Sequence, residues 1–98
     1  MTVLLTPEAE ADIEEAHDWY QEHGMGLAAD FARAIRAALS SIERFPEGYP
    51  IVYRSIRRAL LRRFPYGLFY VPFDDLIYVV GCFHSGRDPS AWERRLDA

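Results

Sequence analysis

LFYVPF (Leu68–Phe73) and LIYVVGCFHS (Leu76–Ser85), joined by Asp74-Asp75, are the two runs of sequence that decide the fold. Both runs are rich in β-branched and aromatic residues and are bounded by Gly, Pro or Asp, which is the pattern of strands joined by tight turns. A third run, Ile56–Phe64, comes just before Pro65-Tyr66-Gly67. Together the three runs predict an antiparallel meander of three strands.

Alternation of side chains sorts the last two strands into two faces when Asp74 and Asp75 form the turn. One face carries Phe69, Val71, Phe73, Leu76, Tyr78, Val80, Cys82 and His84, and the other carries Leu68, Tyr70, Pro72, Ile77, Val79 and Phe83. Large apolar patches rarely stay exposed, so both faces need a cover. Helices earlier in the chain can cover one face. The other face is covered either by the C-terminal segment with long Arg stems or by a partner chain.

Two amphipathic helices are predicted before the meander. Ala9, Ile13, Ala16 and Tyr20 recur at helical spacing, with acidic residues between them. Thr6-Pro7 suits the start of this helix, and Gly24-Met25-Gly26 suits its end. The second helix carries apolar residues at three-and-four spacing and ends before Pro46; they are Leu27, Phe31, Ile35, Ala38, Leu39, Ile42 and Phe45. The apolar run Val3–Leu5 predicts a short strand ahead of both helices.

The order β-α-α-β-β-β predicts an α+β protein with two layers, in which an α-hairpin covers one face of an antiparallel sheet. Ser90 and Glu93 have the spacing of a capping box, so a short C-terminal helix is expected after Asp88-Pro89. A chain of 98 residues fits a single domain, spanning 1–98.

Composition excludes several classes of protein. Half of the residues are hydrophobic and 27% are charged, which is too apolar for a disordered chain and too interrupted by charge for a membrane protein. Met1–Leu5 lacks the basic flank of a secretion signal, so a cytoplasmic protein is expected. Cys82 is the single cysteine, and no Cys and His cluster has zinc spacing. We therefore expect no disulfide, metal or cofactor.

The net charge of −4 conceals a marked asymmetry along the chain. Thr2 to Phe31 carry eight acids and no Lys or Arg, whereas the following segment is rich in Arg and includes Arg54, Arg57, Arg58, Arg62 and Arg63 within ten residues. These five form an anion-binding strip for an acidic partner or an RNA phosphate in one interpretation. In the other, they are solvated charges that protect an edge strand from aggregation.

His84 and Arg87 follow the most apolar strand. His84 could act as a general acid or base, and Arg87 could stabilise the charge that develops during RNA cleavage. The alternative is that His84 and Asp88 only tie the end of the strand to the terminal helix. Cys82 lies two residues from His84 on a strand, so the two side chains point in parallel and a thiol nucleophile is disfavoured. Trp19 lies beside the core residue Tyr20 and is either a packing residue or a binding hot spot.

The chain resembles the RelE/ParE superfamily of type II toxins, in particular its ParE-like, plasmid-stabilisation branch, over nearly its whole length. The resemblance is carried by Leu5–Ile13, by Phe45–Pro50 and most specifically by Arg62–Tyr70 leading to Val80–Pro89 and Trp92. It implies a RelE-like fold and a cytoplasmic toxin that a cognate antitoxin neutralises in a hetero-oligomer. Arg54, Arg57, Arg58, Trp19 and Trp92 are then expected to contact the antitoxin or the target.

Two toxic activities occur among the proteins that the chain resembles. ParE-like members block DNA gyrase without nuclease chemistry, whereas RelE-like members cut mRNA on the ribosome without a metal. The chain has no Lys and no Tyr after its last strand, which departs from the nuclease pattern. Gyrase is therefore the expected target. A metal-independent endoribonuclease using His84, Arg87, Arg62 and Arg63 is the alternative, and a non-toxic interaction module is the third hypothesis.

Overall fold

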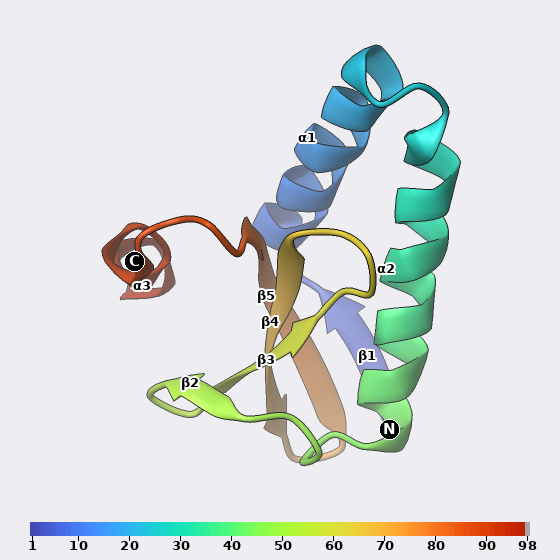
Figure 1. Ribbon diagram of the computed structural model, residues 1–98. Helices are drawn as coiled ribbons and strands as arrows, with labels where there is room; N and C mark the ends of the chain where they lie inside the picture. The colour runs from blue at the N-terminus through green and yellow to red at the C-terminus, as the bar shows by residue number, and fades with distance from the viewer. Residues whose placement is uncertain (98) are drawn as a thin grey trace.

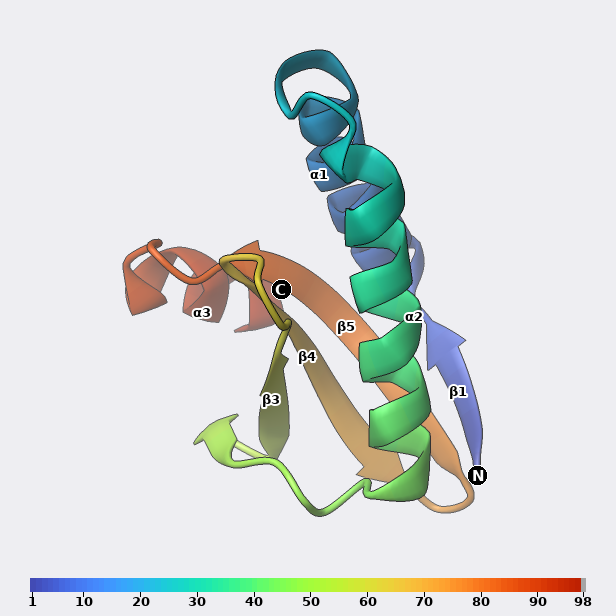
Figure 2. The same cartoon turned by 45° about the vertical axis from the view of Figure 1, so that its right-hand side comes forward.

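A computed structural model describes residues 1–97 of the protein. Its elements follow in the order β1 (Thr2–Leu5), α1 (Pro7–His23), α2 (Leu27–Arg44), β2 (Ile51–Tyr53), β3 (Ile56–Leu60), β4 (Tyr66–Phe73), β5 (Leu76–His84) and α3 (Pro89–Asp97). The strands form one sheet in the order β1-β5-β4-β3-β2. Figures 1 and 2 show the α1–α2 hairpin on one side of this sheet and α3 on the other. The predicted α+β architecture is confirmed.

The sheet is mixed, because β1 runs parallel to β5 while the other neighbours are antiparallel. The sequence predicted an antiparallel sheet and did not predict β2. Parallel strands need a long connection, and the α-hairpin with the first part of the meander supplies it here. The strand predicted over Ile56–Phe64 ends at Leu60, because Arg63 adopts a left-handed φ of 72° and the chain turns before β4.

The helix ends follow the expected capping chemistry. The Thr6 hydroxyl accepts a hydrogen bond from the Ala9 N–H at 3.1 Å, and Pro7 occupies the first helical position of α1. Gly26 has a φ of 90° in the turn between the helices, where a residue with a Cβ would be strained. The third helix differs from the prediction, since the Asp88 carboxylate and not Ser90 caps it by accepting the Ser90 N–H at 2.9 Å.

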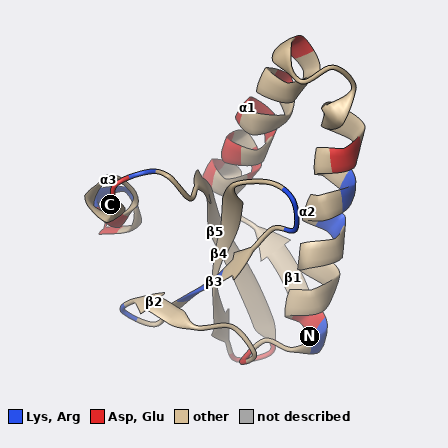
Figure 3. Cartoon of the chain, viewed as in Figure 1, with Lys and Arg blue, Asp and Glu red and all other residues tan. Residues whose placement is uncertain are grey.

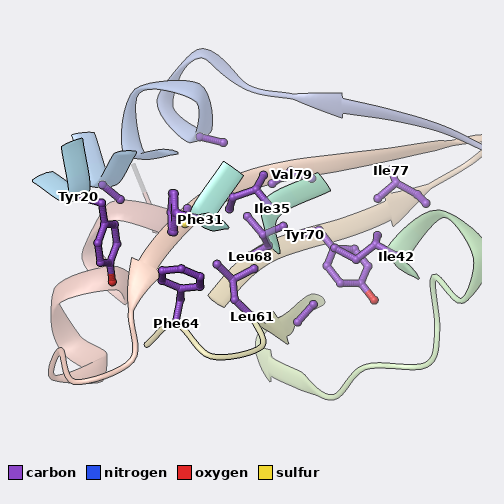
Figure 4. Close-up of a cluster of buried hydrophobic side chains, with 14 of the residues drawn as sticks. Tyr20, Phe31, Ile35, Ile42, Leu61, Phe64, Leu68, Tyr70, Ile77 and Val79 are labelled. Carbon is purple, nitrogen blue, oxygen red and sulfur yellow. The ribbon is translucent and has the colours of Figure 1, made fainter. Parts of the chain in front are cut away.

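The main hydrophobic core lies between the α-hairpin and the sheet (Figure 4). Phe31 and Ile42 of α2 pack there with Leu68, Tyr70 and Val79 of the sheet, and none of these five side chains is exposed. Burying side chains of this size contributes about 1.5–3 kcal/mol each relative to exposure. The Tyr70 hydroxyl is satisfied by donating to the Pro46 carbonyl at 2.8 Å. This contact ties the end of α2 to the centre of the sheet.

A β-bulge at Val80 changes which face the end of β5 presents. Phe69 pairs with Gly81 but Tyr70 pairs with Val79, so Val80 has no partner residue in β4. Beyond the bulge the alternation is inverted: Cys82 belongs to the core under the α-hairpin, and Phe83 packs with Phe69 on the other face. The faces predicted for Cys82, Phe83 and His84 were therefore wrong, although Cys82 and His84 do share a face.

The second face of the sheet is covered by α3. Trp92 packs against Phe69 with ring centroids 4.9 Å apart and against Tyr53 at 6.1 Å. Phe83 completes the buried cluster, and Leu96 and Val80 pack against it. Either the C-terminal segment or a partner chain was expected to cover this face. In the part of the chain that the structure describes, the C-terminal helix α3 covers it.

Candidate functional site

Two adjoining cavities lie where the C-terminal half of α1 passes the end of β5. The first has a volume of about 160 Å³ and is lined by Asp12, Glu15, Ala16, Trp19, Tyr66, Cys82, Phe83, His84 and Arg87. The second has a volume of about 310 Å³ and is lined by Trp19, Tyr20, Pro65, Tyr66 and His84. Since Trp19, Tyr66 and His84 line both, we call the combined hollow the aromatic slot. The slot brings together α1, β4 and β5.

Tyr66 is one of the three residues that line both cavities. Its ring meets the His84 imidazole edge to face, with centroids 5.1 Å apart. Burial is the main cause that raises the pKa of the Tyr66 hydroxyl, and the Glu15 carboxylate raises it further, while the Arg87 guanidinium lowers it. A carboxylate and a guanidinium therefore both act on this phenol, so the slot combines aromatic walls with charges of both signs.

His84 is held in one tautomer by the turn that follows it. Its Nδ1 accepts a hydrogen bond from the Gly86 N–H at 2.9 Å. The neutral imidazole then carries its hydrogen on Nε2. In this form Nε2 can donate a hydrogen bond or a proton but cannot accept a proton. This hydrogen bond is local to the turn after β5. It links His84 to Gly86 and not to Asp88, the partner that one of the two interpretations of His84 predicted for a tie to the terminal helix.

Asp12 and Arg95 bind each other and hydrogen-bond backbone groups at the edge of β5, next to the slot. Arg95 donates from Nη1 and Nη2 to the Asp12 carboxylate at 3.0 and 2.7 Å, and from Nη2 to the Val80 carbonyl at 3.3 Å. Asp12 also accepts the Cys82 N–H at 3.1 Å. From the sequence, Asp12 was one of the acidic residues between the apolar positions of this helix, with no contact predicted for it. Its position three residues after Ala9 and four before Ala16 was the signal that it borders the buried stripe.

The five arginines predicted as one anion-binding strip lie in different surroundings. Arg57 donates to the carbonyls of Glu47 and Tyr49 at 3.2 and 2.6 Å, and Arg54 pairs with Asp97 at 3.1 Å. Arg57 and Arg58 are successive residues of β3 and point to opposite faces of the sheet. Arg62 lines a cavity between α2 and β3, and Arg63 is exposed in the β3–β4 loop. The structure does not gather them into one strip.

The two tryptophans predicted as binding residues are placed differently. Trp19 is 54% exposed and lines the aromatic slot. Trp92 is only 6% exposed, because it is the centre of the cluster beneath α3. In this conformation Trp92 has no surface to offer a partner, so its contact role requires α3 to move. Trp19 keeps its binding role as a prediction.

Cys82 is buried beneath the slot and is not a candidate nucleophile. Burial raises the pKa of the thiol to about 12, and the neighbouring Asp12 carboxylate adds to this effect. The thiol therefore stays protonated at neutral pH. Within residues 1–97, no group of three or more His, Cys, Asp or Glu side chains is placed to hold a metal ion. No helix in the same range is long and apolar enough to cross a membrane.

The described residues form a small mixed sheet with an α-hairpin on one face and a C-terminal helix on the other. The solved structure titled "Chromosomal ParDE TA system from P. aeruginosa" is similar, with a TM-score of 0.65 and 17% sequence identity over 86% of this chain and 95% of that chain. The family model described as the ParE toxin of type II toxin–antitoxin system, parDE, matches residues 3–89. The chain belongs to this ParE toxin family. A comparison with curated proteins found no match.

Proposed function

We propose that this toxin acts by binding, with DNA gyrase as its target, and that a cognate antitoxin neutralises it by forming a hetero-oligomer with it. Membership of the ParE toxin family supports the antitoxin partner. The choice of gyrase rests on the ParE-like resemblance of Arg62–Tyr70 and Val80–Pro89. Binding without chemistry is also consistent with the protonated Cys82 thiol and with the placement of Arg62 and Arg87 in different cavities.

One observation favours a binding toxin over a nuclease. His84 and Arg87 share a cavity with Asp12 and Glu15, whereas Arg62 lines a different cavity against α2. A site that cleaves RNA needs several cations aimed at one phosphate, because the transition state carries extra negative charge there. Carboxylates beside His84 and Arg87 would repel that phosphate. The site chemistry therefore suits a protein ligand better than an RNA backbone.

The nuclease alternative keeps one supporting observation. His84 and Arg87 line one cavity, and the Nε2–H of His84 is free to donate to a leaving oxygen. This arrangement would supply a general acid and one stabilising cation. His84 cannot also be the base, since its Nδ1 accepts the Gly86 N–H, so the Glu15 carboxylate of the same cavity would have to accept the proton.

Expression of the chain in cells, with and without its antitoxin, tests the proposal. We expect growth arrest without the antitoxin, together with a DNA-damage response and intact mRNA. Arrest accompanied by ribosome-dependent mRNA cuts would instead establish the nuclease. Normal growth on confirmed expression of folded protein would leave the non-toxic interaction module as the function.

A further inference from the structure

Trp19 is an exposed aromatic ring that its neighbours hold in place. It stacks on His23, with centroids 5.0 Å apart and an interplanar angle of 24°, and meets Tyr20 edge to face at 5.2 Å. A ring fixed in this way loses little conformational entropy when it contacts a ligand. Trp19 is 54% exposed and lines both cavities of the aromatic slot. Its ring is therefore accessible to a ligand and does not serve packing alone.

The surface around Trp19 is acidic. Glu15 lies four residues before Trp19 and Glu22 three residues after it, so both lie on the same side of α1. Figure 3 shows acidic segments along α1 and no basic segment. Arg87 brings a positive charge to the wall of the slot near β5, and the Asp12 carboxylate is already bound by Arg95. Glu15 is thus the carboxylate that remains for a ligand at the mouth of the slot.

We propose that the aromatic slot binds a lysine or arginine side chain from a basic segment of a protein partner. The cation would lie over the Trp19 or Tyr66 ring, where a partly desolvated cation–π contact is favourable. Its aliphatic stem would pack against Pro65 and Tyr20, and Glu15 would meet its charge. Glu15 and Glu22 would repel a phosphate beside Trp19. Arg87 lines only the first cavity, near β5, so the cation would lie on the α1 side of the slot, beside Glu15 and away from Arg87. The proposal holds for either toxic activity, because it concerns only what the slot recognises.

The test is a titration of the isotope-labelled chain followed by NMR through the indole N–H signal of Trp19, assigned with Trp19→Phe. The probes are a blocked arginine tetrapeptide and a blocked glutamate tetrapeptide. We expect a saturable shift of the Trp19 signal with the arginine peptide and none with the glutamate peptide. The buried Trp92 indole provides the internal reference and should not move. An unmoved Trp19 signal, or equal responses to both peptides, would overturn the proposal.

Two matched variants separate the slot from general attraction to an acidic helix. Glu15→Gln removes the carboxylate of the slot, whereas Glu10→Gln removes one that lines a different cavity between α1 and α2. Each changes the net charge by one. We expect Glu15→Gln to weaken binding of the arginine peptide about fivefold, the size of an exposed ion pair, and Glu10→Gln to weaken it less than about twofold. Equal weakening by both variants would show nonspecific attraction and contradict the proposed slot.

Discussion

The Asp12 carboxylate on α1 is bound by the Arg95 guanidinium on α3 through two hydrogen bonds of 3.0 and 2.7 Å. The pair lies at the edge of β5 just beyond the last residue that pairs with β1, where Thr6 N–H reaches the Val79 carbonyl. Asp12 accepts from Cys82, and Arg95 donates to Val80. Side chains therefore satisfy backbone groups that a neighbouring strand would otherwise pair, which protects an exposed sheet edge.

Loss of either member of this pair should destabilise the protein. Arg95→Ala leaves a mostly buried carboxylate, and Asp12→Ala leaves the Cys82 N–H without its partner. We expect each to lower the free energy of unfolding by about 2 kcal/mol, less than for a fully buried pair because Arg95 keeps 31% of its side chain exposed. Urea unfolding measures the effect, and the exposed neighbour Arg94→Ala is the control, with a change within about 0.5 kcal/mol.

The double variant should lose less than the sum of the two single losses. We expect a coupling energy of about 1 kcal/mol or more, since the two side chains contact each other directly. Additive effects would show that Asp12 and Arg95 stabilise the fold independently and would contradict the account of the sheet edge.

Truncation of the two tryptophans should affect different properties, namely the stability of the fold for Trp92 and the binding activity for Trp19. Trp92→Ala removes the centre of the cluster formed with Phe69 and Phe83, so we expect a loss of about 3 kcal/mol in unfolding free energy. Trp19→Ala removes an exposed ring and should change stability by less than about 1 kcal/mol while reducing toxicity or antitoxin binding. Chemical denaturation and a growth assay measure the two effects. A Trp19→Ala protein that is as unstable as Trp92→Ala would make Trp19 a packing residue.

The Cys82 thiol should be inert in the folded protein. With its pKa raised to about 12, almost no thiolate is present at pH 8, and the side chain is also buried. We expect no reaction with iodoacetamide until denaturant unfolds the chain, as followed by intact-mass spectrometry. Rapid labelling under native conditions would mean that the end of β5 opens readily.

The same pKa shift predicts a loss of stability in alkali. The thiol of the unfolded chain loses its proton near the ordinary value of 9.0, whereas the folded chain holds it until about pH 12. The folded state binds the proton more tightly, so the stabilising contribution of Cys82 is complete below pH 9 and is lost as pH rises towards 12. Between pH 8 and 11, the midpoint temperature of thermal unfolding should fall less steeply with pH for Cys82→Ala than for the parent chain. Identical slopes for the two proteins would contradict the shift.

Truncation of the candidate nuclease residues should leave toxicity intact. His84→Ala and Arg87→Ala remove exposed side chains, and neither lies at the centre of the core. A toxin that works by binding gyrase does not need their chemistry. Both residues line the aromatic slot, but the contacts proposed for its ligand come from Trp19, Tyr66 and Glu15, so we expect each variant to retain growth arrest. The circular dichroism spectrum confirms the fold of each. Loss of arrest in both folded variants, together with loss of mRNA cuts made by the parent chain, would establish the nuclease.

Local sequence patterns predicted most of the helices and strands. They did not predict on which faces of the sheet the last side chains of β5 lie. Helical spacing from Ala9 to Tyr20 and alternation from Leu68 to Val79 reflect contacts with one buried face, and such contacts repeat regularly. The bulge at Val80 depends on how β4 and β5 pair across the sheet, which no local pattern reports. Its consequence is non-local too, because Phe83 then packs beneath α3 while Cys82 lies under the α-hairpin.

The candidate site was predicted in part for the same reason. His84, Arg87 and Trp19 were identified from their residue types and positions, and the structure brings all three to the aromatic slot. Glu15 and Tyr66 were missed, since each is unremarkable beside its sequence neighbours and reaches the slot only through the packing of α1 on the sheet. The arginines were expected to act together because they are close in sequence, yet neighbouring strand positions face opposite sides of the sheet.

The most direct test of the proposed mechanism is gyrase activity in vitro. The purified chain is added to gyrase with relaxed plasmid and ATP, with and without its antitoxin, and supercoiling is followed on a gel. We expect the chain to block supercoiling at concentrations comparable to that of gyrase and the antitoxin to restore it. Unchanged supercoiling at a large excess of folded, growth-arresting toxin would contradict it.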